Sequence, residues 1–265
     1  MTQPILLTGG TGTLGRQVAP LLREAGRPVR ILSRHGHDAT EGVEYVVGDL
    51  DTGAGVAEAV AGVEAVIHCA GAQKGDDVKT SHLVDAARSL GAPHLVFISV
   101  VGADRVPVEG ALDRAMFGYF ASKRAAELVV EQSALPWTTL RATQFHDLIW
   151  MVAGALSRLP VVPVPSGARF QPVDSGEVAE RLVELALGPA SGLVPDLAGP
   201  RAYGLGELVR SYLSATGKRR LLVPFPVLGK AGRAIKDGAN LNLDQAVGRR
   251  TWEEFLEQRV GAQAE

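Results

Sequence analysis

Short apolar runs alternate with longer segments whose apolar residues recur every three or four positions, through the first two thirds of the chain. The apolar runs are continuous, as expected of strands buried on both faces of a parallel sheet. Strands are predicted at 4–10, 28–34, 43–49, 65–71, 94–102 and 137–143. Helices are predicted at 14–26, 55–63, 79–92, 119–134, 175–187, 204–217 and 251–259. Strands that alternate with helices predict an α/β fold, in which helices cover both faces of a doubly wound parallel sheet.

The alternation loosens after Phe145, where prolines gather at Pro160, Pro163 and Pro165. No stretch of disordered composition separates this part from the rest, so a linker between independent domains is not expected. We therefore predict a first domain over 1–145. Residues 146–265 are expected to form a small cap that packs on the strand ends of the same domain and completes a substrate pocket.

Composition narrows the functional classes. The chain has 265 residues, of which 46% are hydrophobic and 21% charged, as in an ordinary globular protein. Its net charge of −2 and the lack of basic runs argue against nucleic-acid binding. We expect no signal peptide and no membrane span, and hence a cytoplasmic protein. Cys69 is the single cysteine, which excludes an internal disulfide, and no histidine has partners at metal-ligand spacing, so no metal site is predicted.

A glycine-rich loop joins the first predicted strand to the first predicted helix. Gly9, Gly12 and Gly15 are spaced as G-x-x-G-x-x-G. This spacing suits a tight turn, a close approach of the backbone to a pyrophosphate and close packing of helix on strand, which is the Rossmann-type arrangement. Free N–H groups at the start of the helix, together with the Thr11 and Thr13 hydroxyls, would bind the phosphates. A Walker loop is excluded because Arg16 and Gln17 follow the last glycine.

The end of the second predicted strand indicates which dinucleotide is bound. NAD sites usually carry an acidic residue there, which binds the ribose 2′-hydroxyl. This chain has Ser33 and Arg34 instead. A guanidinium can pair with a 2′-phosphate, so NADPH is favoured over NADH. Alternatively, Arg34 is simply exposed and stacks on adenine, which would suit either cofactor.

Tyr119 and Lys123 lie four residues apart in a predicted helix, a spacing that puts both side chains on one face. An ammonium beside a tyrosine favours the phenolate and lowers its pKa. Such a tyrosine can exchange a proton with a substrate carbonyl or hydroxyl near neutral pH. Lys123 could also hold the hydroxyls of the nicotinamide ribose.

Together these segments resemble the short-chain dehydrogenase/reductase superfamily. The resemblance rests on TGGTGTLG at 8–15, GDL at 48–50, CAG at 69–71, FIS ending at Ser99, and Tyr119-x-x-x-Lys123. The glycine spacing and the segment at 171–187 are most similar to its atypical, NmrA-like branch. The resemblance implies further cofactor contacts from Leu14 in the glycine loop, Asp49 and Leu50 at the adenine, Cys69, Ala70 and Gly71 at the adenosine ribose, and Thr143, Gln144 and Phe145 at the nicotinamide.

The family also places a catalytic serine or threonine at or just after the end of the fifth strand. Ser99 is the one hydroxyl available there, because Val100 and Val101 follow it. We therefore take Ser99, Tyr119 and Lys123 as the catalytic candidates and as cofactor contacts. If Ser99 lies one or two positions early, Tyr119 alone would polarise the substrate oxygen.

The favoured function is an NADPH-dependent reductase of a small, largely apolar carbonyl, quinone or aromatic polyketide-like compound. The atypical branch implies the same, since its members reduce quinones, dyes and enone-like aromatics. Substrate contacts are predicted from Phe145, His146, Ile149 and Trp150, although ordinary core packing explains this apolar stretch equally well. Two alternatives stay open, a dinucleotide-sensing regulator without turnover and a nucleotide-sugar epimerase or dehydratase. A small-molecule substrate and a monomer or homodimer are expected, and nothing in the sequence calls for a flavin.

Overall fold

The structure is a computed structural model that describes residues 2–38 and 41–264. Within this range the chain divides into two compact units. Unit 1 comprises 1–99, 121–141 and 176–195, and unit 2 comprises 100–120, 142–175 and 196–265. The predicted boundary after 145 is close to the change of unit after Arg141, but each unit also takes a segment from the other side of that boundary.

A seven-stranded sheet organises unit 1. Its strands are β1 (Ile5–Thr8), β2 (Val29–Ser33), β3 (Val43–Val47), β4 (Ala65–His68), β5 (His94–Val100), β6 (Trp137–Ala142) and β9 (Gly192–Leu193). They lie in the order β3-β2-β1-β4-β5-β6-β9, and β1 pairs in parallel with both β2 and β4. This is the classic dinucleotide-binding order, whose switch point lies where β1 meets β4. The predicted Rossmann-type parallel sheet is therefore confirmed.

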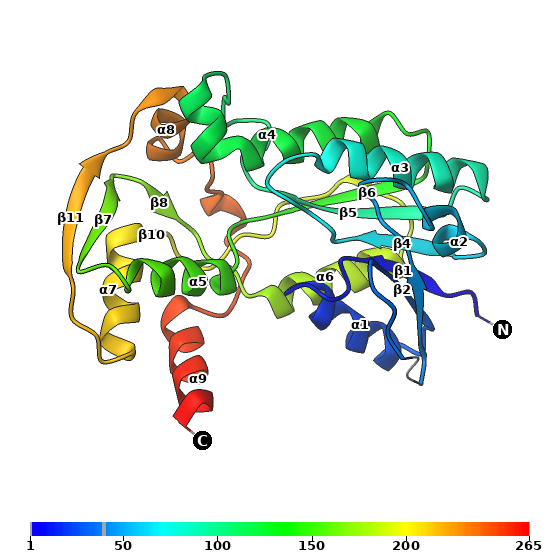
Figure 1. Ribbon diagram of the computed structural model, residues 1–265, viewed down its shortest axis with the longest axis horizontal. Coiled ribbons are helices and arrows are strands. Elements are labelled where there is room, and N and C mark those ends of the chain that lie inside the picture. The colour runs from blue at the N-terminus through cyan, green and yellow to red at the C-terminus, as the bar shows by residue number, and fades with distance from the viewer. Residues whose placement is uncertain (1, 39–40, 265) are drawn as a thin grey trace. The chain divides into compact units, whose positions relative to one another are not determined.

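Helices cover both faces of this sheet (Figure 1). Helices α2 (Val56–Val60), α3 (Asp76–Ser89) and the second half of α4 (Ala111–Glu131) bury one apolar cluster against it. Helices α1 (Gly15–Glu24) and α6 (Ser175–Leu187) lie on the other face. Continuous apolar strands were the signal for this architecture, because a strand covered on both faces has no polar side to expose.

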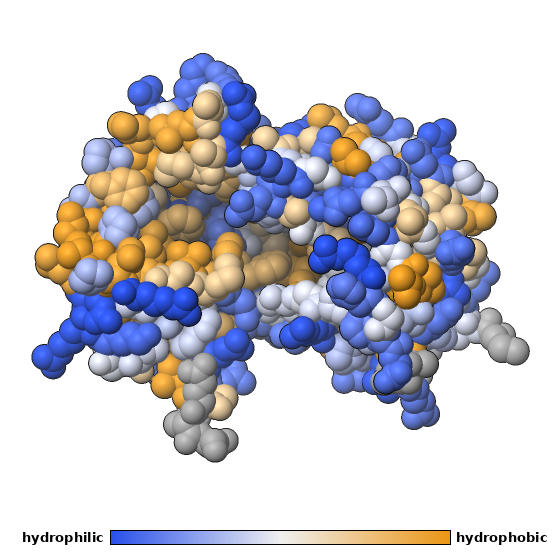
Figure 2. All heavy atoms as spheres, in the orientation of Figure 1, coloured by the Kyte–Doolittle hydropathy of each residue, from blue (hydrophilic) through white to orange (hydrophobic). Residues whose placement is uncertain are grey.

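Unit 2 contains α5 (His146–Leu156), α7 (Leu205–Ala215), α8 (Gly229–Lys236), the short 3₁₀ helix η1 (Leu243–Gln245), α9 (Trp252–Ala264) and the first half of α4. It has two small sheets. The strands β7 (Val161–Ser166) and β11 (Leu221–Pro226) pair in parallel, while β8 (Arg169–Phe170) and β10 (Tyr203–Gly204) are antiparallel. Apolar side chains gather over β7 and β11 at the surface (Figure 2), among them Val161, Leu221 and Val223. Its main apolar cluster is formed by α5, α7, α9 and β7.

The element boundaries depart from the predictions in several helices, and α9, for example, ends at Ala264 instead of 259. The helix predicted at 119–134 begins eight residues earlier, at Ala111, and α3 begins at Asp76 instead of 79. Helix α5, helix α8 and the β7–β11 pair were not predicted at all. Two prolines in β7 and two in β11 would break a central strand, but they are tolerated here because each strand has a partner on one side only.

Candidate functional site

The glycine loop of unit 1 is closely packed at two of the three glycines of the G-x-x-G-x-x-G spacing. Gly9 has a φ of +68°, and a Cβ there would lie 2.7 Å from the backbone nitrogen of Ala70. A Cβ on Gly15 would lie 2.2 Å from the Gly9 carbonyl oxygen. Both positions therefore exclude a side chain. They bring the start of α1 against the ends of β1 and β4.

The third glycine and its neighbours face outward. Thr11, Gly12 and Thr13 are exposed, and a Cβ on Gly12 would approach only the Gly9 oxygen, at 3.2 Å. Helix α1 begins after Leu14 without a side-chain cap and has no acidic residue in its first turn. The N–H groups of Arg16 and Gln17 donate to the carbonyl oxygens of Gly12 and Leu14, so the partial positive charge at this end of α1 is the feature that suits a pyrophosphate.

The end of β2 offers a hydroxyl and a guanidinium. Ser33 Oγ accepts a hydrogen bond from the His35 backbone N–H at 3.3 Å and lies 3.1 Å from His37 Nε2. The neighbouring Arg34 is exposed, and it makes no hydrogen bond or ion pair with any other residue that the structure describes. Its guanidinium is therefore available to an anion from solvent.

The loop after β3 is held by its own polar groups. Asp49 Oδ1 accepts the Asp51 backbone N–H at 2.9 Å, and the Leu50 carbonyl oxygen lies 2.8 Å from His82 Nδ1. Leu50 is buried, while Asp49 is half-buried. Both stay predicted adenine contacts.

A buried histidine fastens the ends of β1 and β4 together. His68 Nδ1 lies 2.7 Å from Thr8 Oγ1, and its Nε2 lies 3.2 Å from Thr80 Oγ1. Thr8 Oγ1 also accepts the Ala70 backbone N–H at 3.2 Å. Burial, assisted by the positive charges of Lys123 and Lys79, lowers the pKa of His68 to about 3, so the ring is neutral. It acts as a fixed polar bridge behind the segment 69–71.

That segment contains the single cysteine. Burial raises the pKa of the Cys69 thiol to about 12, although the positive charge of Lys123 acts in the opposite direction. Since the thiolate is the reactive form, this cysteine is inert near neutral pH. We expect that Cys69, like Ala70 and Gly71, contacts the cofactor through its backbone and not through its side chain.

Lys123 lies in a buried ion pair that sequence reasoning missed. Its Nζ is 3.1 Å from Asp76 Oδ2 and donates to the Ile98 carbonyl oxygen at 3.3 Å. Asp76 Oδ1 accepts the Ala72 backbone N–H at 2.6 Å, and the Asp76 N–H donates to Ser122 Oγ. A Cβ on Gly71 would lie 3.0 Å from Nζ, so the absence of a side chain there makes room for the ammonium. The sequence feature that could have indicated this ion pair is the acidic pair at 76–77, which follows a glycine.

Ser99 is buried beside a second ion-pair network. Glu127 accepts two hydrogen bonds from the Arg141 guanidinium, at 2.7 and 2.8 Å, and one from Arg124 at 2.9 Å. Burial alone would raise the pKa of Glu127, but the hydrogen bonds from Arg141 and Arg124 lower it below its usual value. The Ser99 hydroxyl lies close enough to Glu127 to contribute to this shift, but its buried oxygen forms no hydrogen bond within the described residues. Its catalytic part stays a prediction.

Tyr119 lies in the first half of α4, with 39% of its surface exposed. Its ring packs edge-on against Phe120, with the centroids 6.3 Å apart. Lys123, four residues on, lies in the second half of the helix and is only 3% exposed. An exposed phenol can contact a substrate oxygen directly, whereas the buried lysine can act only through its positive charge. Both catalytic parts remain predictions.

The segment after β6 belongs to unit 2. Thr143 Oγ1 accepts the Gly199 N–H at 3.1 Å, Gln144 Oε1 accepts the Gln171 N–H at 3.3 Å, and Phe145 forms a parallel bridge with Val173. These bonds fix the backbone that the resemblance assigns to the nicotinamide.

The predicted substrate residues divide into core and surface. His146 is fully buried, its Nε2 lies 3.0 Å from the Arg250 carbonyl oxygen, and its ring stacks on Phe255. Burial lowers the pKa of His146, so the ring is neutral. Ile149 is also buried, while Trp150 is half-buried and lines a surface groove of unit 2. His146 and Ile149 thus pack in the core, as the alternative interpretation of this apolar stretch expects. Their contacts with a substrate stay predictions.

Within 2–38 and 41–264, no group of three or more His, Cys, Asp or Glu side chains could hold a metal ion. No helix in the same ranges is long and apolar enough to cross a membrane.

Comparison with known proteins places this arrangement among dinucleotide-binding proteins. A family model described as NAD(P)H-binding matches residues 9–149. The chain is 32% identical to a (4-alkanoyl-5-oxo-2,5-dihydrofuran-3-yl)methyl phosphate reductase of Streptomyces griseus, over 77% of this chain and 70% of that protein. It is 26% identical to an NAD(P)H azoreductase of Xenophilus azovorans, over 81% of this chain and 74% of that protein. The NADPH complex of an Escherichia coli quinone oxidoreductase, QOR2, superposes with a TM-score of 0.79 at 18% identity, covering 96% of this chain and 99% of that one.

Proposed function

Since the chain belongs to the NAD(P)H-binding family, in the atypical, NmrA-like branch of the short-chain dehydrogenases/reductases, we propose that it is an NADPH-dependent reductase. Its acceptor is a small, largely apolar carbonyl, quinone or aromatic polyketide-like compound. The observation that carries the proposal is the uncapped start of α1 behind a glycine loop in which two positions exclude any side chain. A loop built only to turn the chain has no need for an exposed, uncapped helix end.

The residues of unit 1 fit a dinucleotide. The positive end of the α1 dipole and the backbone of the glycine loop would bind the pyrophosphate, with Thr11 and Thr13 as further donors. Arg34 would pair with a 2′-phosphate, since it is exposed and has no acidic partner among the described residues. This supports a preference for NADPH over NADH. When bound, NADPH supplies the hydride.

The remaining chemistry is a proton transfer, which we assign to Tyr119. Reduction of a carbonyl leaves negative charge on the substrate oxygen, and a phenol within hydrogen-bond reach can protonate it. Ser99 and Lys123 complete the catalytic set in this proposal. Asp76 holds the Lys123 ammonium in place, so that its charge is fixed behind the segment 69–71.

The names of the relatives support a reductase. They include an azoreductase, a furan phosphate reductase and a quinone oxidoreductase. The substrates of these three proteins differ in shape and polarity. What their names have in common is reduction, and two of the three name NAD(P)H or NADPH, which is the part we carry over to this chain.

The test is NADPH oxidation with a panel of quinones, azo dyes and aromatic ketones, for the wild type and Tyr119→Phe. Loss of the acid should lower turnover of a ketone about a hundredfold while NADPH affinity is kept. Equal turnover in both proteins would remove Tyr119 from the mechanism. Tight NADPH binding without turnover of any acceptor would overturn the reductase and favour the sensing regulator.

A further inference from the structure

An open groove lies on the surface of unit 2, between α5, α7 and the end of α9, with a volume of about 850 Å³. This lies within the usual range for sites that hold small molecules. Every residue that lines it belongs to unit 2, whereas the glycine loop, Arg34 and Lys123 belong to unit 1. The groove is therefore built from different residues than the dinucleotide site.

One wall of the groove is aromatic. The rings of Trp150 and Tyr212 meet edge to face, with their centroids 4.8 Å apart. Small residues between them keep the space open, namely Gly154, Ala155 and Ala215. Such a wall favours a flat apolar body, because ring faces and edges offer contact area at little entropic cost.

Tyr212 also brings a hydroxyl without a partner. The residue is only 5% exposed, and its hydroxyl forms no hydrogen bond with any residue in the described part of the chain. A Cβ on Gly154, which also lines the groove, would lie 3.2 Å from this oxygen. The oxygen itself is not sealed from solvent, so it can donate a hydrogen bond to a polar atom of a ligand in the groove.

The charge of the lining has one sign. Arg158 and Lys218 both line the groove, and the lining contains no acidic residue. Lys218 Nζ lies 3.1 Å from Ser157 Oγ and 5.7 Å from the centroid of the Tyr212 ring, so the ammonium is held close to the aromatic wall. Two cations without a counter-charge in the lining favour an anionic ligand group.

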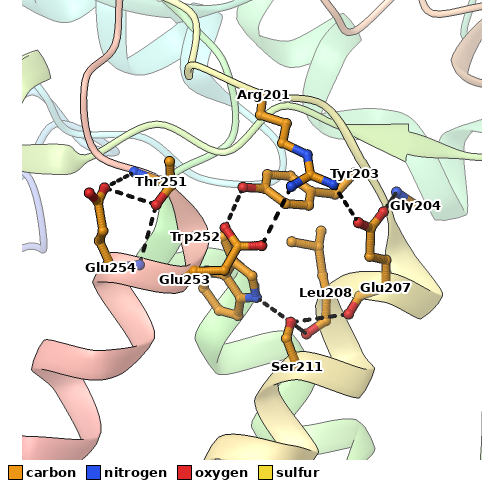
Figure 3. A network of polar contacts seen from close by, with 10 residues as sticks. All are labelled: Arg201, Tyr203, Gly204, Glu207, Leu208, Ser211, Thr251, Trp252, Glu253 and Glu254. Atoms are coloured by element: carbon orange, nitrogen blue, oxygen red, sulfur yellow. Dashed lines mark hydrogen bonds and ion pairs between the residues drawn. The ribbon is translucent and has the colours of Figure 1, made fainter.

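The walls are fixed in advance by a polar network that joins β10 and α7 to α9 (Figure 3). Trp252 Nε1 donates to Ser211 Oγ at 2.9 Å, and the Tyr203 hydroxyl donates to Glu253 at 2.6 Å. Below this network, Tyr212, Phe255 and Ile149 share one apolar cluster, which joins α5 to the same two helices. A preformed site loses little entropy when a ligand binds.

We propose that this groove binds a small aromatic carboxylate. The flat ring lies against Trp150 and Tyr212, the carboxylate pairs with Lys218 and Arg158, and a carboxylate oxygen accepts a hydrogen bond from the Tyr212 hydroxyl. The proposal does not depend on the reductase activity, since none of these four residues is assigned to hydride or proton transfer.

The test is calorimetric titration of the full chain with 2-naphthoate and, in parallel, with the uncharged 2-naphthamide. We expect saturable binding of one 2-naphthoate and at least tenfold weaker binding of the amide. Lys218→Gln should weaken 2-naphthoate binding about tenfold, because a charge-assisted contact is lost. Arg219→Gln makes the same charge change one residue away, outside the lining, and should leave the affinity unchanged.

Two further variants separate the groove from general surface charge. Tyr212→Phe removes only the hydroxyl and should weaken binding several-fold, while Ala155→Trp, at an exposed lining position, should abolish it by filling the groove. The proposal is overturned by the absence of saturable 2-naphthoate binding, by equal binding of acid and amide, or by equal effects of Lys218→Gln and Arg219→Gln. Unchanged binding in Ala155→Trp overturns it as well.

Discussion

Lys123 Nζ lies 3.1 Å from Asp76 Oδ2, and the two side chains are only 3% and 1% exposed. The pair joins the second half of α4 to the first turn of α3 and fixes the ammonium next to Gly71 and the end of β5. Charges buried this deeply are tolerated only when each has its partner and further hydrogen bonds. The Ile98 carbonyl and the Ala72 N–H provide those bonds.

The first prediction concerns the stability provided by this pair. Asp76→Asn keeps the size of the side chain but leaves the Lys123 ammonium buried without a counter-charge. Breaking such a pair should lower the free energy of unfolding by about 3 kcal/mol, measured by urea denaturation. Asp77→Asn is the matched control, since it removes the same charge from the next residue, which does not belong to the ion pair. Equal losses in the two variants would contradict the account.

The second prediction concerns the pH dependence of stability. The pKa of His68 is about 3 in the folded chain and 6.5 when unperturbed, so between these values the unfolded chain binds the extra proton. Stability from this residue is therefore complete above pH 6.5 and is lost as the pH falls. Between about pH 6 and pH 5 the expected loss is roughly 1 kcal/mol.

The check compares wild type with His68→Gln by urea denaturation at several pH values. The variant should lose less free energy of unfolding over the same interval, whatever its absolute stability. The lowered pKa values of His94 and His146 act in the same direction and remain in both proteins, so they cancel in the difference. Parallel pH profiles would show that His68 is not buried in its neutral form.

The third prediction separates the two kinds of glycine in the loop. A Cβ on Gly15 would lie 2.2 Å from the Gly9 oxygen, so Gly15→Ala must shift the backbone and should cost about 2 kcal/mol of stability. Gly12→Ala meets only one atom, at 3.2 Å, and points to the exposed side of the loop. It should keep the stability and weaken NADPH binding about tenfold, because close approach of the pyrophosphate is lost. Tight NADPH binding by Gly12→Ala would contradict the proposal that the pyrophosphate binds at the glycine loop.

The fourth prediction concerns cofactor choice. Arg34→Gln should weaken NADPH binding about tenfold through loss of a charge-assisted contact, while NADH binding stays the same. Equilibrium binding of both cofactors to both proteins measures this. Arg16→Gln is the matched control, an exposed arginine in the same region whose loss should not change the ratio. Equal weakening of NADPH and NADH in Arg34→Gln would support the adenine-stacking alternative.

The sheet of unit 1 could be predicted because its signals are local. Each strand is a short apolar run, and Gly9 to Gly15 mark where the first strand passes into a helix. The start of α4 was missed because residues 111–118 show no clear apolar period, and packing in unit 2 decides their conformation. The strands β7 and β11 were missed because prolines normally argue against a strand.

The candidate site was predicted in part for the same reason. Backbone-determined positions such as Gly12 follow from spacing alone. The Asp76–Lys123 pair joins residues 47 positions apart (123 minus 76), and the Thr8–His68 contact joins residues 60 apart. Contacts of this kind depend on how the chain folds back on itself, which a local pattern does not contain. Ser99 is the clearest example. Its position in the sequence did not predict that its hydroxyl lies near Glu127 in the folded chain.

The most direct test of the central claim follows the hydride itself. NADPH carrying deuterium at one or the other face of nicotinamide C4 is oxidised by the wild type with an accepted aromatic ketone, and the alcohol product is analysed by mass spectrometry. The account predicts that deuterium from one face only appears on the carbinol carbon. Deuterium in the product from neither face, or NADPH that binds without being consumed by any ketone, quinone or azo dye, would contradict a reductase.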